Sequence, residues 1–131
     1  MAGTATSTIK SYTMPNSGRS IQMVRIDWVA DAANGSVPTV TIPALYGYVV
    51  KTVTKPGGTA PTNNYTINFQ DQEDTAVDAL GGTMTNNRSA TVTQVAFPLP
   101  GALFCGQYVF SLSGNSVNSA TGYVMIFVDA Q

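Results

Sequence analysis

Acidic side chains gather in one short stretch of the sequence, at Asp71, Glu73, Asp74 and Asp78. Carboxylate oxygens suit Ca²⁺, but the stretch lacks the ligand spacing and the glycine of an EF-hand loop. A glycoside hydrolase would need two carboxylates about 5–10 Å apart in a groove, and Glu73, the only glutamate, falls in an expected loop. The cluster is therefore interpreted as a solvated turn, followed by a helical turn that Asp74 caps and that ends near Gly82.

Nucleophilic and metal chemistry have little support in this sequence. The chain has no histidine, so the usual general base and the commonest metal ligand are both missing. Its serines consequently cannot belong to a Ser-His-Asp arrangement. The single cysteine, Cys105, cannot form an intrachain disulfide, and it is expected to be a small buried hydrophobe. The sequence predicts no enzyme, no catalytic residues, no metal site and no cofactor.

Four aromatic residues, Trp28, Tyr46, Tyr48 and Tyr123, could provide a platform on which a sugar ring stacks. Trp28, however, alternates in phase with two aliphatic residues of the same segment, which favours a place in the core. A carbohydrate-binding module for host recognition thus remains an alternative to the function favoured below.

The composition limits the possible partners. Only 10% of the 131 residues are charged, against about a quarter in an average protein, and the formal net charge is −1. A nearly neutral chain has no long-range field to attract nucleic acid. No apolar run approaches the ~20 residues of a membrane span, and the first residues lack the features of a secretory signal. We expect neither nucleic acid nor a membrane to be a partner.

Alternation with a period of two residues indicates strands throughout the chain. In one such segment Tyr65, Ile67 and Phe69 share a face; with Trp28, Phe110 and Ile126 they form the expected core. The predicted strands cover residues 7–12, 21–30, 37–43, 46–54, 65–70, 90–97, 108–113 and 122–128.

The connections between these strands suggest how they are arranged. The turn-rich segment between 46–54 and 65–70 predicts a hairpin. The last strand is apolar on both faces, which indicates that it is central or covered on both sides. Val77 and Leu80 would form the apolar side of the one helical turn. The fold class is all-β: an antiparallel β-sandwich or jelly roll of about eight strands, with at most one short helical turn.

The beginning of the chain differs from the rest. Residues 1–14 are small and polar, and they are expected to form either a flexible arm or an edge strand of a single β-sandwich domain over residues 15–131. Ile9, Tyr12 and Met14 are the larger side chains that could anchor such an arm on another subunit or on a capsid. These three residues are the predicted assembly contacts.

Four segments resemble a group of small virion proteins of tailed bacteriophages. They are Tyr48–Ile67, whose turn follows the pattern P-G-G-T-x-P-T-x-N-Y, then Asp78–Gly82, Asn87–Thr91 and the apolar Gly122–Val128. The resemblance covers about two thirds of the chain. Its motifs are structural turns, so they indicate a fold more firmly than a role.

The resemblance implies a structural role in the virion. The role that best suits a small, neutral, histidine-free chain is that of a capsid cement or decoration protein on the outer surface of an icosahedral head. Assembly would take place in the host cytoplasm, with the major capsid protein and copies of the chain itself, as a dimer or trimer, as partners. A tail or head–tail connector component is the alternative within the virion.

Overall fold

The computed structural model describes residues 1–16, 18–71, 77–98 and 102–130, and within these ranges it contains strands and no helix. All paired strands are antiparallel. The prediction of an all-β antiparallel fold is confirmed. The strands are β1 (Thr4–Thr13), β2 (Ser20–Val29), β3 (Val40–Pro56), β4 (Thr66–Asp71), β5 (Gln94–Ala96), β6 (Leu103–Ser113) and β7 (Thr121–Ala130).

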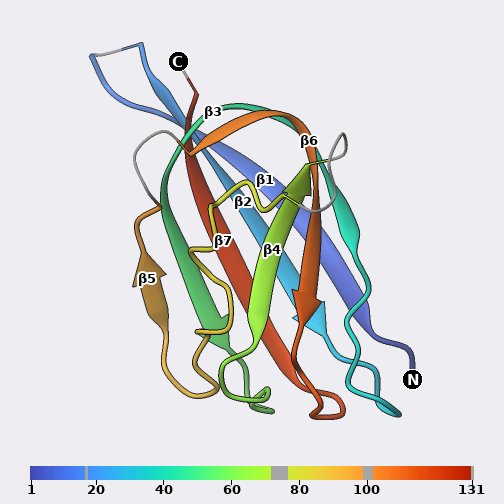
Figure 1. Cartoon of the computed structure of the whole chain (residues 1–131). Coiled ribbons are helices and arrows are strands. Elements are labelled where there is room, and N and C mark those ends of the chain that lie inside the picture. Colours follow the sequence, from blue (N-terminus) through green and yellow to red (C-terminus); the bar gives the residue numbers. More distant parts are fainter. Residues whose placement is uncertain (17, 72–76, 99–101, 131) are drawn as a thin grey trace.

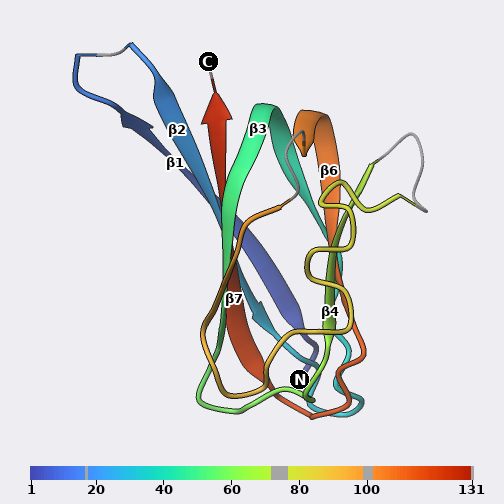
Figure 2. The ribbon, with the colours of Figure 1, turned by 60° about the vertical axis from the view of Figure 1, so that its left-hand side comes forward.

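The seven strands form one sheet that folds over on itself. Its order is β1-β2-β7-β3-β6-β4, and the short β5 also pairs with β3. The first part of β3 pairs with β6, whereas its second part pairs with β7 and β5. Strand β3 consequently passes from one layer to the other across the top of the molecule, with β1, β2 and β7 on one side and β4 and β6 on the other (Figures 1 and 2). The result is a sandwich whose two layers share a strand.

Two irregularities allow β3 to change layers. The pairing shifts between Ile42 and Leu45 against β6, and between Val49 and Lys51 against β7. Pro43, which has no N–H for a ladder, lies within the first shift. Because pairing resumes after that bulge, the predicted strands 37–43 and 46–54 are parts of one strand. The structure therefore has seven strands where about eight were expected.

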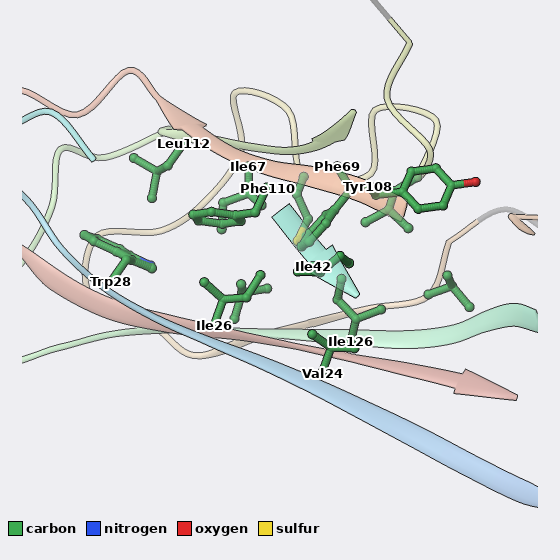
Figure 3. Close-up of a cluster of buried hydrophobic side chains, with 14 of the residues drawn as sticks. Val24, Ile26, Trp28, Ile42, Ile67, Phe69, Tyr108, Phe110, Leu112 and Ile126 are labelled. Atoms are coloured by element: carbon green, nitrogen blue, oxygen red, sulfur yellow. The ribbon is translucent and has the colours of Figure 1, made fainter. Parts of the chain in front are cut away.

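The core lies between the two layers (Figure 3). β2 and β7 supply one wall, and β4, β6 and the first part of β3 supply the other. The six predicted core residues, Trp28, Tyr65, Ile67, Phe69, Phe110 and Ile126, are all buried. The alternation in the sequence thus assigned the inward faces of β2, β4 and β6 correctly, and Ile126 of β7 is buried as predicted.

Two charged side chains of the described residues are buried, Asp129 on the outer side of β7 and Arg88 next to this core. Arg88 is held by polar neighbours. Its Nη1 donates to the hydroxyl of Thr54 at 3.0 Å, and its Nε donates to the side-chain oxygen of Asn87 at 2.8 Å. Tyr65 pairs with Arg88 through the backbone in an isolated bridge. Removal from water lowers the pKa of Arg88 and raises the pKa of Tyr65 to about 12.

Two expectations about strand pairing and length are wrong. The predicted hairpin of 46–54 with 65–70 does not form, because β6 lies between β3 and β4. The predicted strand 90–97 is reduced to β5, Gln94–Ala96. There the Ser89 hydroxyl accepts hydrogen bonds from the N–H groups of Thr91 and Val92, which turns the chain before it can extend.

The segment after β4 is organised by Asp78. Its carboxylate accepts hydrogen bonds from the N–H groups of Phe69, Leu80 and Gly82. The predicted cap, Asp74, lies outside the described residues. Leu80 is buried as expected, but Val77 is exposed, so the two do not form one apolar side. The described part of this segment is a series of turns.

These turns cover the free edge of β4. The N–H of Ile67 donates to the carbonyl of Met84 at 3.0 Å, and the N–H of Ala79 donates to the carbonyl of Phe69 at 2.8 Å. Hydroxyl and amide side chains add two further links, Thr66 with Asn86 and Thr85 with Asn68. The main chain of β4 is consequently occupied on both sides.

Candidate functional site

The described residues of the acidic stretch, Asp71 and Asp78, do not form a cation site. Glu73 and Asp74 lie outside the described residues, and Asp78 is engaged with its own loop. Among the described residues, no group of three or more His, Cys, Asp or Glu side chains could hold a metal ion. The carboxylate of Asp78 therefore acts on the protein's own backbone.

The four aromatic residues considered for sugar stacking do not form one platform. Trp28 is buried and packs edge-on against Tyr65, with ring centroids 5.9 Å apart. Its place in the core, favoured from the sequence, is confirmed. Tyr46 and Tyr48 are exposed by 63% and 52%, and Tyr123 lies at the other end of the same sheet face. Trp28 is thus unavailable to any ligand.

A different feature emerges on the side of the sheet that points away from the core. We call it the outer sheet face, and it is built from β1, β2, β7 and the second part of β3, with β5 and the first residue of β6 at its margin. Directly opposed residues of neighbouring strands share a face, so the pairing arranges these side chains in rows across the sheet. The four rows are Tyr12-Ile21-Asp129-Tyr48-Leu103, Lys10-Met23-Phe127-Lys51, Thr8-Arg25-Met125-Val53-Val95 and Thr6-Asp27-Tyr123-Lys55.

Cationic side chains cover the two aromatic rings that β7 presents on this face. The guanidinium carbon of Arg25 lies 4.0 Å from the ring centroid of Tyr123. The Nζ of Lys51 lies 4.7 Å from the centroid of Phe127, and the Nζ of Lys55 lies 6.0 Å from that of Tyr123. Such contacts combine cation–π attraction with burial of the aliphatic stems.

These cationic side chains explain how β7 can be apolar on both faces. β7 is central, between β2 and β3, as predicted. Its inner side chains are buried in the core, whereas Tyr123 and Phe127 on the outside are only half-buried. Long cationic side chains cover this outer face, and no strand of the described residues forms a second layer over it.

Arg25 is held in position by Asp27. Its Nε donates to both carboxylate oxygens of Asp27, at 3.1 and 3.0 Å, and its Nη2 donates to one of them at 2.9 Å. The hydrogen bond to Asp27 raises the pKa of Arg25. Arg19 and Asp129 form a second ion pair at the opposite end of β2.

Exposed apolar side chains border these cations. Tyr12, Tyr48, Val95 and Leu103 end or extend the rows and are all more than two fifths exposed. Cys105, expected in the core, lies opposite Tyr46 on the surface because its neighbour Phe104 takes the inward position. The outer sheet face is therefore a broad surface with a cationic centre and an apolar margin.

The predicted assembly contacts lie on or next to β1. Ile9 is half-buried and packs against the core, whereas Tyr12 points to the outer sheet face. Met14 is exposed just beyond the strand, and its N–H donates to the carbonyl of Arg19 at 2.8 Å. The three side chains do not share one surface; contact through Tyr12 and Met14 stays a prediction.

The N-terminal segment, expected to be an arm or an edge strand, is paired over ten residues with β2. As the first strand of the sheet order, β1 has a second edge, and no described strand pairs with it. Lys10 is the sole charged side chain on β1. This long edge is free to accept a further strand.

Sequence reasoning missed the outer sheet face, although a signal was present. Arg25 and Asp27 alternate with apolar residues of their segment, and Lys51 and Lys55 occur at alternate positions around Val53. Each pair alone indicates a solvated strand face. The cations become one surface only through the register of β1, β2, β7 and β3.

No helix in the described residues is long and apolar enough to cross a membrane. Comparison with known proteins matches this sequence to no protein-family model and to no curated protein.

Proposed function

We propose that the protein is a structural virion protein of a tailed phage, and that it acts as a decoration protein on the outer surface of the icosahedral head. Its partners in this role are the major capsid protein and further copies of itself. The sequence resemblance suggests the virion, and the outer sheet face suggests a docking function.

The observation that carries the proposal is the exposed apolar margin around the cationic centre. Monomeric soluble proteins rarely keep a large apolar patch in water, and such patches are typical of interaction sites. Tyr46 and Tyr48 lie on neighbouring outward positions of β3, and Leu103 lies opposite Tyr48 on β6. A rigid sheet presents these side chains without an entropic penalty for ordering a loop.

The experiment that tests the proposal counts copies in purified virions and measures binding to heads. We expect hundreds of copies per particle, bound to the head, and reassociation of purified protein with heads from which it has been removed. Roughly a dozen copies or fewer, located at the tail, would assign the protein to the tail or connector, where rings have low cyclic symmetry. Binding of host glycans without binding of heads would favour a carbohydrate-binding module.

A further inference from the structure

We infer that the outer sheet face is the surface through which the protein docks, and that its partner is an acidic protein surface with apolar side chains among its carboxylates. The inference rests on the proposed function and specifies the contact surface and the chemistry of the partner. Its argument comes from the distribution of charge on the described residues.

The cations of the chain are concentrated on this face. Of the six Lys and Arg residues in the sequence, four lie on its rows: Lys10, Arg25, Lys51 and Lys55. The two carboxylates on the same rows, Asp27 and Asp129, are engaged by Arg25 and Arg19. A chain with a net charge of −1 thus presents a locally positive surface.

A second copy of the chain does not suit this surface face to face. Two such faces would bring two sets of the four cations together, and like charges across an interface oppose association. Copies of the protein would therefore meet through another part of the molecule, and the outer sheet face is left for a partner of opposite charge.

The apolar margin of the outer sheet face favours a protein over a polyanion as the partner. Phosphate contacts use Lys and Arg and gain nothing from aliphatic side chains. Here Val95 and Leu103 are more than two fifths exposed at the ends of their rows, and Tyr48 is half exposed beside Leu103. A protein interface buries apolar side chains and also makes polar contacts, so a protein surface can satisfy both the apolar margin and the cations of the face.

The two parts would have different roles in binding. Exposed cations such as Lys55 speed the approach of an acidic surface and fix its orientation. Tyr48 and Leu103 would supply most of the affinity by burying apolar area. Binding should accordingly weaken as salt is added but should not disappear.

The test compares two variants with equal changes in charge. Lys51→Gln with Lys55→Gln removes two positive charges from the outer sheet face. Thr41→Glu with Ser113→Glu adds two negative charges at exposed positions of β3 and β6 in the other layer, so the net charge is the same. A third variant, Val95→Thr with Leu103→Thr, places β-branched residues that favour strands at both positions and removes apolar surface from the margin. Melting temperatures would verify that all three fold.

The probe is purified heads from which the native protein has been removed, titrated at several salt concentrations. We expect the wild type and the Thr41/Ser113 variant to bind alike, and the Lys51/Lys55 variant to bind at least tenfold more weakly with less dependence on salt. The Val95/Leu103 variant should also bind more weakly, with its salt dependence retained.

The possible failures are distinguishable. If the wild type does not bind heads, the proposed function fails, and this inference fails with it. If the wild type binds and the Lys51/Lys55 variant binds equally well, only the docking surface is overturned. If the wild type binds heparin or phosphatidylglycerol vesicles as tightly as heads, and loses both with the two lysines, the surface recognises polyanions and the protein partner is overturned.

Discussion

Arg88 and Thr54 show how single residues depend on a shift of register that the sequence does not reveal. In an uninterrupted strand Val49, Lys51 and Val53 would share a face. The extra residue in the second irregularity of β3 sends Lys51 and Val53 outward and brings Thr52 and Thr54 into the core. The inward hydroxyl of Thr54 then accepts the hydrogen bond of the buried guanidinium.

We expect Thr54→Val to destabilise the protein by about 1–3 kcal/mol, because it leaves a buried donor of Arg88 without its acceptor while preserving side-chain volume. Urea unfolding measures the change in the free energy of unfolding. Thr8→Val, on the exposed side of β1, is the control and should change it by less than about 0.5 kcal/mol. Equal effects of the two substitutions would contradict the role given to Thr54.

Ionisation of the Tyr65 phenol makes the stability of the fold depend on pH in the alkaline range. Burial raises the pKa of its phenol to about 12, whereas a tyrosine in the unfolded chain titrates near pH 10. The stabilisation is therefore complete below about pH 10 and is lost as the pH rises towards about 12, because the unfolded state ionises first. Denaturation at a series of pH values should show this loss in the wild type.

Tyr65→Phe is the matched variant. The Tyr65 hydroxyl is buried and has no hydrogen-bond partner among the described residues, so its removal should leave stability near neutral pH unchanged or slightly higher. The part of the alkaline loss that belongs to this phenol should vanish. Parallel pH curves for the variant and the wild type would refute the assignment.

At the scale of elements, the bend of β3 depends on Gly47. Its φ is 150°, and a Cβ there would lie 2.3 Å from the carbonyl oxygen of Asp129 on the neighbouring β7. We expect Gly47→Ala to lower the free energy of unfolding by roughly 1–3 kcal/mol, because backbone must move to admit the methyl group. A Cβ on Gly58 has no atom within 4 Å, so Gly58→Ala is the control and should be neutral. Chemical denaturation of both variants measures the free energy of unfolding, and equal values would show that Gly47 is not required.

The free edge of β1 leads to a prediction about self-association. If copies pair through this edge, the backbone N–H groups of residues 4–13 that point away from β2 should exchange with solvent more slowly at high protein concentration. Amides of β7, which is paired on both sides, should be unaffected. Exchange in β1 that does not change while the protein assembles would assign the contact between copies to another surface. Deleting residues 1–14 is a less specific test, because it also removes Ile9 from the core.

Local patterns could identify most of the strands but not their partners. Alternation marks β2, β4 and β6 because each buries one face against the opposite layer, whereas β7 is marked by an apolar run. It cannot show that β6 enters between β3 and β4, since the turn after Pro56 would suit a hairpin equally well. The short β5 was overestimated because the hydrogen bonds of the Ser89 hydroxyl outweigh the strand preference of Thr91 and Val92.

At the scale of the whole molecule, the outer sheet face could not be predicted from the sequence, because it too depends on how the strands pair. Lys10, Arg25, Lys51 and Lys55 are up to 45 residues apart in sequence, and each alone is a solvated strand residue. Their assembly into one surface requires the registers of three strand pairs at once. The acidic stretch gave a stronger signal in sequence because its residues are adjacent, although Asp78 serves the loop that contains it.

The shared strand also predicts that the two layers unfold together. β3 is paired in both, so neither layer can keep its full set of hydrogen bonds once the other is lost. Thermal unfolding followed by the fluorescence of Trp28, on β2, should coincide with the loss of strand signal in far-UV circular dichroism. Two separate transitions would show that the layers are independent.

The positions of the two ends of the chain have a mechanical consequence. Thr4 is opposite Val29 and Ala130 is opposite Ser20, so the termini lie at opposite ends of the β1-β2-β7 layer (Figure 1). A force that pulls them apart acts along the strands and strains the hydrogen bonds of both ladders simultaneously, in shear. A hairpin pulled from its open end instead breaks its bonds one after another. The molecule should therefore resist stretching between its termini, because many hydrogen bonds would have to break at once.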